Sequence, residues 1–142
     1  MNTPSSPVPE AEALCVDASC PGNPGPMEYR GVHLPSGREV FHYGPIQATN
    51  NIGEFLAVVH ALALLQQQRS AMTIYTDSRT ALAWVRNRKA KTLLARTAET
   101  ELAFQLVERA ERWLRTHMWP NRIEKWDTTQ WGEIPADYGR KK

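Results

Sequence analysis

The chain has 142 residues, a length that fits one domain, and its 42% hydrophobic and 23% charged residues are typical of a globular protein. No apolar run approaches the roughly 20 residues that a membrane-spanning helix needs, so we expect no membrane partner. The formal net charge of +2 is too small to indicate a nucleic-acid partner by itself.

The sequence divides into a short tail and one folded unit. The first ten residues, MNTPSSPVPE, are rich in Pro and Ser and lack the basic start and apolar stretch of a signal peptide. We therefore expect a disordered tail over residues 1–11, a single domain over 12–142, and a cytoplasmic location. Cys15 and Cys20 match no zinc-ligand spacing, which predicts free thiols.

The first half of the chain predicts an antiparallel meander followed by a helix. ALCVDA is a short apolar run that ends at the turn-forming CPGNPGP, and PSG suits a hairpin turn between two alternating segments. Apolar residues then recur at helical spacing after Thr49 and Asn50, which are possible caps. The predicted elements are strands over 13–18, 27–34 and 38–46 and a helix over 50–68.

The second half predicts the parallel part of an α/β domain. AMTIYT is rich in strand-forming residues, and a long amphipathic helix precedes RIEKW. The predicted elements are strands over 71–76 and 122–126, helices over 80–86 and 97–116, and a short helical turn from Ile134 that carries Asp137. We therefore predict a five-stranded mixed sheet, with its three antiparallel strands first, flanked by helices.

Four acidic residues stand in phrases that direct carboxylates toward one point: Asp17 in VDASCPGNPGP, Glu54 in TNNIGEF, Asp77 in IYTDSRT and Asp137 in WGEIPADYGRK. Carboxylates that converge at strand and helix ends form a hard oxygen site, which suits Mg²⁺ or Mn²⁺. The pattern indicates metal-dependent phosphoryl chemistry. Each acid alone also has a structural interpretation as a turn or helix-capping residue.

Basic residues gather in two places, which bears on the partner. Arg86, Arg88, Lys89 and Lys91 lie in one segment, and the chain ends in GRKK. Such clusters are typical of a protein that contacts a phosphate backbone. A solvated helix face and its loop is the alternative interpretation.

The phrases D-x-S-x-x-GNPG, TNN-x-x-E, TDS and KWDTTQWGEIPADYGRK occur in this order from Leu14 to Lys141. The chain resembles a type 1 ribonuclease H, of the subgroup that ends in WGEIxADYGRK and has no histidine in the catalytic loop. The resemblance implies a ribonuclease H-like fold and one catalytic domain over 12–142. It also implies an endonuclease that hydrolyses the RNA strand of RNA–DNA hybrids and leaves 5′-phosphate and 3′-hydroxyl ends.

The resemblance also implies the catalytic machinery. Two Mg²⁺ ions about 4 Å apart, for which Mn²⁺ can substitute, would stabilise the attacking and leaving oxygens. Their ligands would be Asp17, Glu54, Asp77 and Asp137. Glu133 would take the place of the loop histidine and assist metal exchange and product release. The four histidines lie outside this loop, and we expect them to be surface or structural residues.

The substrate contacts follow from the same resemblance. The residues expected to line the minor groove of the hybrid, where 2′-hydroxyl groups distinguish RNA from DNA, are Ser19, Cys20, Asn23, Asn50, Asn51 and Arg79. Those expected to grip a phosphate of the DNA strand are Thr49, Asn51, Thr92 and Thr128. We expect a monomer. The alternatives are a hybrid-binding module with little catalysis and another nuclease of the same superfold.

Overall fold

The sheet is mixed and five-stranded, with the strand order β3-β2-β1-β4-β5. It belongs to a computed structural model that describes residues 8–139. The first three strands pair antiparallel, whereas β1 with β4 and β4 with β5 pair parallel, which confirms the predicted fold class. The strands are β1 (Ala13–Ser19), β2 (Gly25–Leu34), β3 (Glu39–Ala48), β4 (Thr73–Thr76) and β5 (Ile123–Lys125).

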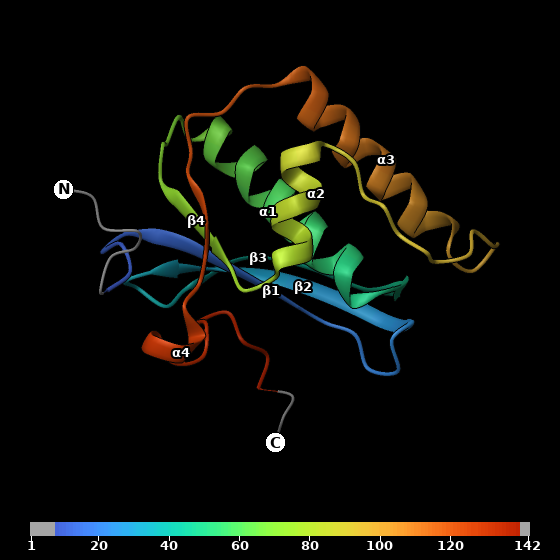
Figure 1. The fold of residues 1–142 in the computed structure, drawn as a ribbon, viewed down its shortest axis with the longest axis horizontal. Helices are drawn as coiled ribbons and strands as arrows, with labels where there is room; N and C mark the ends of the chain where they lie inside the picture. The colour runs from blue at the N-terminus through green and yellow to red at the C-terminus, as the bar shows by residue number, and fades with distance from the viewer. Residues whose placement is uncertain (1–7, 140–142) are drawn as a thin grey trace.

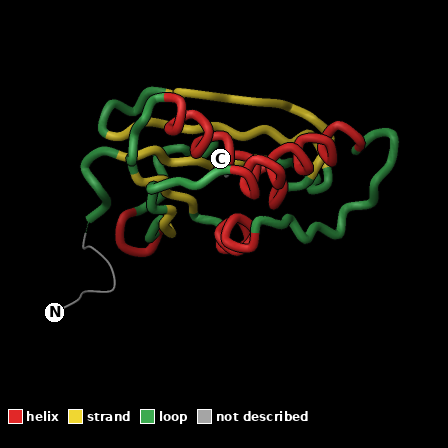
Figure 2. The backbone as a smooth tube through the Cα atoms, turned by 90° about the horizontal axis from the view of Figure 1, so that it is seen from above, coloured by secondary structure: helices red, strands yellow, loops and turns green. Residues whose placement is uncertain are grey.

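The three longer helices cover one face of the sheet, and the C-terminal segment crosses the other (Figure 1). The helices are α1 (Asn50–Gln67), α2 (Arg79–Asn87), α3 (Glu101–Thr116) and the short α4 (Thr128–Trp131). Seen from above, the segment between α2 and α3 runs out to one side of the domain, as it also does in the first view (Figure 2).

The central strand β1 is buried along its whole length because both faces of the sheet are covered. Leu14, Val16 and Ala18 pack into the larger core under the helices. Cys15, on the opposite face, joins a smaller core whose C-terminal members include Trp126, Ile134 and Ala136. A strand buried on both faces reads as a continuous apolar run, which explains why ALCVDA is interrupted only by Asp17.

Most element bounds differ from the predicted ones by one or two residues, and two differences in the second half of the chain are larger. Helix α3 begins at Glu101 instead of 97, because Thr97 and Thr100 form a hydrogen-bonded turn in which the Thr100 amide donates to the Thr97 carbonyl at 3.1 Å. The short helix α4 forms before the predicted helical turn, with Asp127 as its cap. Residues 134–137 instead form a single turn, closed by a 2.8 Å hydrogen bond from the Asp137 amide to the Ile134 carbonyl.

Further predictions concern the two ends of the chain. Residues 1–7 of the predicted tail and the basic residues 140–142 lie outside the described part. Within the described part, the Glu10 amide donates to the Tyr75 hydroxyl at 2.9 Å, so the end of that tail touches the domain.

No helix among residues 8–139 has the length and apolar character needed to cross a membrane. Cys15 and Cys20 are free thiols, as predicted, and both are buried.

Candidate active site

Asp17 lies on β1 and is only 2% exposed. It stands directly opposite Arg30 of the antiparallel neighbour β2. Alternation along β1 places Asp17 on the same sheet face as Ala13 and Cys15, the face that the C-terminal segment covers. A carboxylate therefore sits within an otherwise apolar strand, at a position shielded from water.

Asp77 comes directly after β4, the parallel neighbour of β1. The last paired residues are Cys15 and Tyr75, so continuing the register places Asp77 beside Asp17. The adjacent Ser78 caps α2, since its hydroxyl accepts a 3.0 Å bond from the Ala81 amide. The capping function considered for Asp77 thus belongs to Ser78, and the half-buried Asp77 carboxylate is directed by the strand end.

Glu54 comes from the beginning of α1 and is 3% exposed. Thr49 caps the N-terminus of the helix, because its hydroxyl accepts a hydrogen bond from the Ile52 amide. The preceding Gly53 lets the helix lie against the sheet: a Cβ there would come within 2.9 Å of the Ala18 Cβ and 2.8 Å of the Met27 sulfur. This close approach brings Glu54 to Asp17, as the four acidic phrases predicted, although the contact of Gly53 with the sheet was not predicted.

The three carboxylates form one cluster. Asp17, Glu54 and Asp77 each offer an oxygen, and the three oxygens lie within 4.8 Å of one another. Burial, the charge and hydrogen bond of Asp17, and the charge of Asp77 raise the pKa of Glu54, and the Ala18 backbone partly opposes them. One Glu54 oxygen is buried with no hydrogen-bond partner in the described structure. This oxygen-only, mutually repelling set fits a hard divalent cation such as Mg²⁺.

Asp137 and Glu133 lie outside this three-carboxylate cluster as described. The half-buried Asp137 accepts a 2.9 Å bond from the Gly139 amide through its side chain. Its backbone carbonyl accepts a 2.7 Å bond from Arg30, the residue opposite Asp17. The C-terminal segment is thus held over the sheet face that carries Asp17. Glu133 is exposed in the stretch between α4 and that turn.

The glycine-rich loop after β1 touches the beginning of α1, which brings together most of the expected substrate contacts. The Asn23 side-chain oxygen accepts a 2.9 Å bond from the Asn50 amide. The Cys20 thiol donates to the Ala48 carbonyl at 3.4 Å. Ser19 and Cys20, two further residues of this expected set, are both buried.

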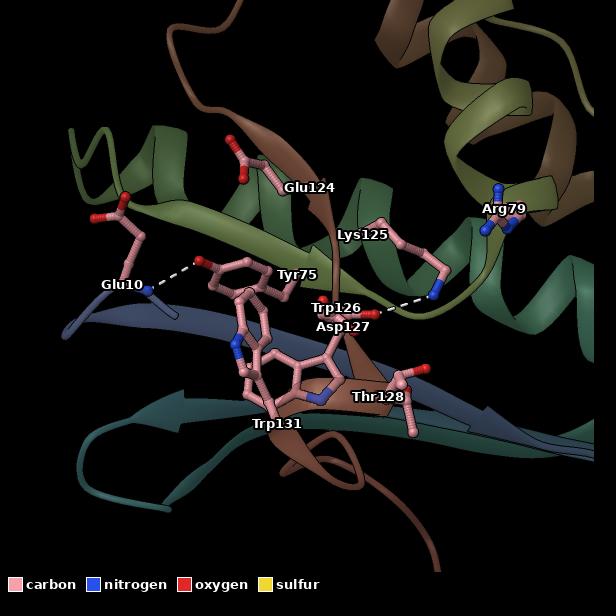
Figure 3. A pocket seen from close by; sticks show the side chains of 10 residues that line it. Glu10, Tyr75, Arg79, Glu124, Lys125, Trp126, Asp127, Thr128 and Trp131 are labelled. Atoms are coloured by element: carbon pink, nitrogen blue, oxygen red, sulfur yellow. Dashed lines mark hydrogen bonds between the residues drawn. The ribbon is translucent and has the colours of Figure 1, made fainter. Parts of the chain in front are cut away.

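The expected phosphate-gripping residues fall into two separate pockets. Thr49, Asn51 and Thr92 line a cavity of about 640 Å³, together with Asn23 and Lys91. Thr128 lines a different cavity of about 350 Å³ beside Arg79 and Lys125 (Figure 3). Three of the four residues therefore meet in one place, and Thr128 lies with Arg79.

The histidines make contacts unrelated to the carboxylate cluster. His60 shares a 2.8 Å hydrogen bond with the Tyr29 hydroxyl and stacks on Phe41, and burial lowers its pKa. His33 and His42 lie beside glutamates, and His117 stacks on Trp113. These contacts agree with the surface or structural roles expected from the sequence.

Comparison with known proteins defines the family. A family model described as RNase H matches residues 9–129. Ribonuclease H of Verminephrobacter eiseniae (strain EF01-2) is 38% identical over 108 residues, covering 72% of this chain and 64% of that protein. Ribonuclease H of Neorickettsia sennetsu (strain ATCC VR-367 / Miyayama) is 35% identical over 71 residues, covering 49% and 47%. The chain spans less than two thirds of either relative.

Solved structures show the same fold. RNase H1 from the halophilic archaeon Halobacterium salinarum NRC-1 matches with a TM-score of 0.52 and 22% identity, over 84% of this chain and 88% of that one. LC11-RNase H1, isolated from compost by a metagenomic approach, has a TM-score of 0.52 and 17% identity, over 84% and 86%. The sheet order defines a domain of the ribonuclease H-like class. The family match over residues 9–129 goes further: the chain belongs to the RNase H family.

Proposed function

We propose that this protein is an endonuclease that hydrolyses the RNA strand of RNA–DNA hybrids with two divalent metal ions. The observation that carries the proposal is the buried cluster of Asp17, Glu54 and Asp77, within 4.8 Å, in a member of the RNase H family. Mg²⁺ is the proposed ion, with Mn²⁺ as a substitute, because carboxylate oxygens are hard ligands. The proposed active form is a monomer.

The proposed reaction adds water across one P–O3′ bond of the RNA strand. The water oxygen stays on the 5′-phosphate, and the released 3′ oxygen takes up a proton. Bound metal ions would lower the pKa of the attacking water and stabilise the charge on the leaving oxygen. Asp17, Glu54 and Asp77 would hold them, and Asp137 is the proposed fourth ligand, carried by the segment that crosses Asp17's face of the sheet.

The surrounding residues would orient the hybrid. The bond between Asn23 and the Asn50 amide holds the glycine-rich loop beside the N-terminus of α1, where backbone amides attract anionic oxygens. Ser19, Cys20, Asn23, Asn50 and Asn51 are the proposed minor-groove contacts. Thr49, Asn51 and Thr92 line one cavity of about 640 Å³ together with Lys91, which supports their proposed contact with a phosphate of the DNA strand.

The proposed contacts of Arg79 and Thr128 differ from those expected from the sequence, because both residues line the second cavity. The guanidinium of an arginine is a permanent cation with several hydrogen-bond donors, which suits an anionic phosphate at this position. Arg79 is exposed and is the first residue of α2, which begins two positions after Asp77. We therefore assign the pair to one backbone phosphate on the side of β5 and α4 (Figure 3).

Glu133 is the proposed aid to metal exchange and product release, as in the WGEIxADYGRK subgroup. Its exposed position in the stretch before Ile134 leaves the carboxylate accessible to solvent and ions. Glu133→Gln is expected to reduce multiple turnover while single-turnover cleavage and hybrid binding stay close to wild type. Equal turnover of the variant and wild type would contradict this assignment.

The decisive experiment uses end-labelled RNA–DNA hybrid, RNA duplex and DNA duplex with Mg²⁺, Mn²⁺ or EDTA. Wild type is expected to cut only the RNA strand of the hybrid and only with metal. Asp77→Asn should lose at least about 100-fold in rate, since even outer-shell residues of metal sites cost 10–100-fold. Glu99→Gln, which removes an exposed carboxylate before α3, is the matched control and should cut normally.

The alternatives have distinct outcomes in the same experiment. Binding of the hybrid without cutting under either metal would favour a hybrid-binding module. Cutting of DNA duplexes or branched DNA in preference to the hybrid would favour another nuclease of the same superfold. Either result would overturn the proposed activity and leave the family assignment intact.

A further inference from the structure

Arg30 connects the active-site strands to the C-terminal segment. Its Nε atom donates to the Ala136 carbonyl at 2.8 Å, and its Nη2 atom donates to the Asp137 carbonyl at 2.7 Å. The guanidinium also lies over the Tyr138 ring, 4.9 Å from its centre. These contacts join residues more than 100 positions apart in the chain.

The two carbonyls belong to the peptide groups on either side of the Asp137 Cα. A planar guanidinium that binds both of them fixes the orientation of both peptides and therefore the direction in which the Asp137 side chain leaves the backbone. The buried side chains of Ile134 and Ala136 already seat the preceding turn on this face. Arg30 adds a direct constraint on the backbone at Asp137, the proposed fourth metal ligand.

The position of Arg30 on β2 also links it to the carboxylate cluster. It is the direct cross-strand partner of Asp17, so its side chain emerges on the sheet face of that carboxylate. Its other neighbours include Glu39, with a 3.5 Å contact at the surface, so the arginine has an acidic partner away from the cluster. Arg30 thus spans from the strand beside Asp17 to the backbone of Asp137.

We infer that Arg30 is a positioning residue that holds Asp137 in reach of the metal site. This inference rests on the proposed function, because Asp137 is a proposed ligand there. Lysine cannot replace arginine in this role: a single ammonium presents no planar fork to two successive carbonyls. A purely electrostatic role near Asp17 would, in contrast, be satisfied by lysine.

The first experiment asks whether Arg30 holds the segment, without reference to catalysis. Hydrogen exchange of residues 134–139 is measured by mass spectrometry for wild type, Arg30→Gln, Arg30→Lys and Arg38→Gln. Arg38 is an exposed arginine on the hairpin next to β2 and serves as the control. We expect faster exchange of this segment in both Arg30 variants only, with unchanged exchange in β1 and α1. Unchanged exchange in the Arg30 variants would overturn the inference.

The second experiment asks whether Arg30 acts through Asp137. Hybrid cleavage is measured against Mg²⁺ concentration for Arg30→Gln, Asp137→Asn and the double variant. Arg30→Gln is expected to lower kcat by about 10–100-fold and to raise the Mg²⁺ requirement, with KM for the hybrid unchanged. In the Asp137→Asn background the Arg30 substitution should have no further effect. A full additional loss there, or wild-type activity of Arg30→Lys, would overturn the inference.

A failure of the proposed function is separable from a failure of this inference. If wild type cuts no hybrid, Mn²⁺ binding is measured by calorimetry for wild type, Arg30→Gln and Arg38→Gln. Weaker binding in Arg30→Gln alone supports the positioning role even then, and equal binding in all three proteins overturns it.

Discussion

At the scale of single residues, the environment of Glu54 opposes its charge. Burial and the nearby Asp17 and Asp77 carboxylates raise its pKa. Without a cation the folded protein therefore favours protonated Glu54, whereas the unfolded chain ionises near pH 4.5. Stability from this group is present at low pH and is lost as pH rises from about that value toward the raised folded pKa.

Replacing this carboxyl should therefore stabilise the protein when metal is absent. In EDTA at pH 8, Glu54→Gln is expected to unfold at a higher temperature than wild type, and the difference should shrink toward pH 5. Added Mg²⁺ should raise the melting temperature of wild type more than that of the variant, because the cation relieves the same repulsion. Calorimetric scans at both pH values test this, and a variant less stable than wild type at pH 8 would contradict it.

Gly53 controls how closely α1 approaches the sheet. In Gly53→Ala the new Cβ would lie within 3 Å of the Ala18 Cβ and the Met27 side chain. Overpacking of this kind costs about 1–3 kcal/mol, and relief requires a shift of the helix that carries Glu54. We expect a lower midpoint in urea together with a raised Mg²⁺ requirement for cleavage. Loss of stability with an unchanged Mg²⁺ requirement would show that Glu54 does not depend on this contact.

At the scale of elements, α3 holds the segment that follows α2. The buried Glu111 accepts a 2.8 Å hydrogen bond from the Ala90 amide. Arg88, at the left-handed end of α2, donates to the Leu114 carbonyl and lies over Trp119. Helix α3 thus fixes the path of the chain that delivers Lys91 and Thr92 to the 640 Å³ cavity.

Glu111→Ala should release this segment. It leaves the buried Ala90 amide without its acceptor, which costs about 1–3 kcal/mol of stability. Weaker hybrid binding should follow, measured by fluorescence anisotropy with the inactive Asp77→Asn protein in Ca²⁺. Glu108→Ala on the same helix is the control, because its ion pair with Arg96 is exposed to solvent and contributes little to stability. Equal binding by both variants would contradict this role for Glu111.

At the scale of the whole molecule, sequence patterns located the elements better than the contacts between them. Asp17 and Asp77 could be predicted because Asp17 lies near the end of one strand and Asp77 follows the end of another, and parallel pairing of those strands brings them together. Glu54 was also predicted, from its place in TNNIGEF, but the glycine-mediated approach of α1 that brings it to Asp17 is not visible in the periodicity. Arg30 and Glu111 act across long separations in the chain, and Thr128 lies in another cavity than Thr92, because tertiary packing alone decides which loops meet.

The charge of the molecule also has a consequence for binding. A net charge of +2 offers little general attraction, so affinity for the hybrid should depend on a few cations at defined positions, and its salt dependence should scale with the number of phosphates that they contact. Lys91 lines the cavity with Thr49 and Thr92, whereas the neighbouring Lys89 is paired with Glu111 at 3.9 Å. If Lys91 contacts a phosphate, Lys91→Gln should reduce the slope of log affinity against log salt by about 1.

Lys89→Gln provides the matched control, since it removes the same charge from the same segment. Binding of the hybrid by the Asp77→Asn protein is measured over a series of salt concentrations for both lysine variants. A reduced slope for Lys91→Gln alone places the DNA-strand phosphate in the Thr49 and Thr92 cavity. Equal slopes for the two variants would show that the segment acts only through its general charge, and the proposed phosphate site would then have to lie elsewhere on this face.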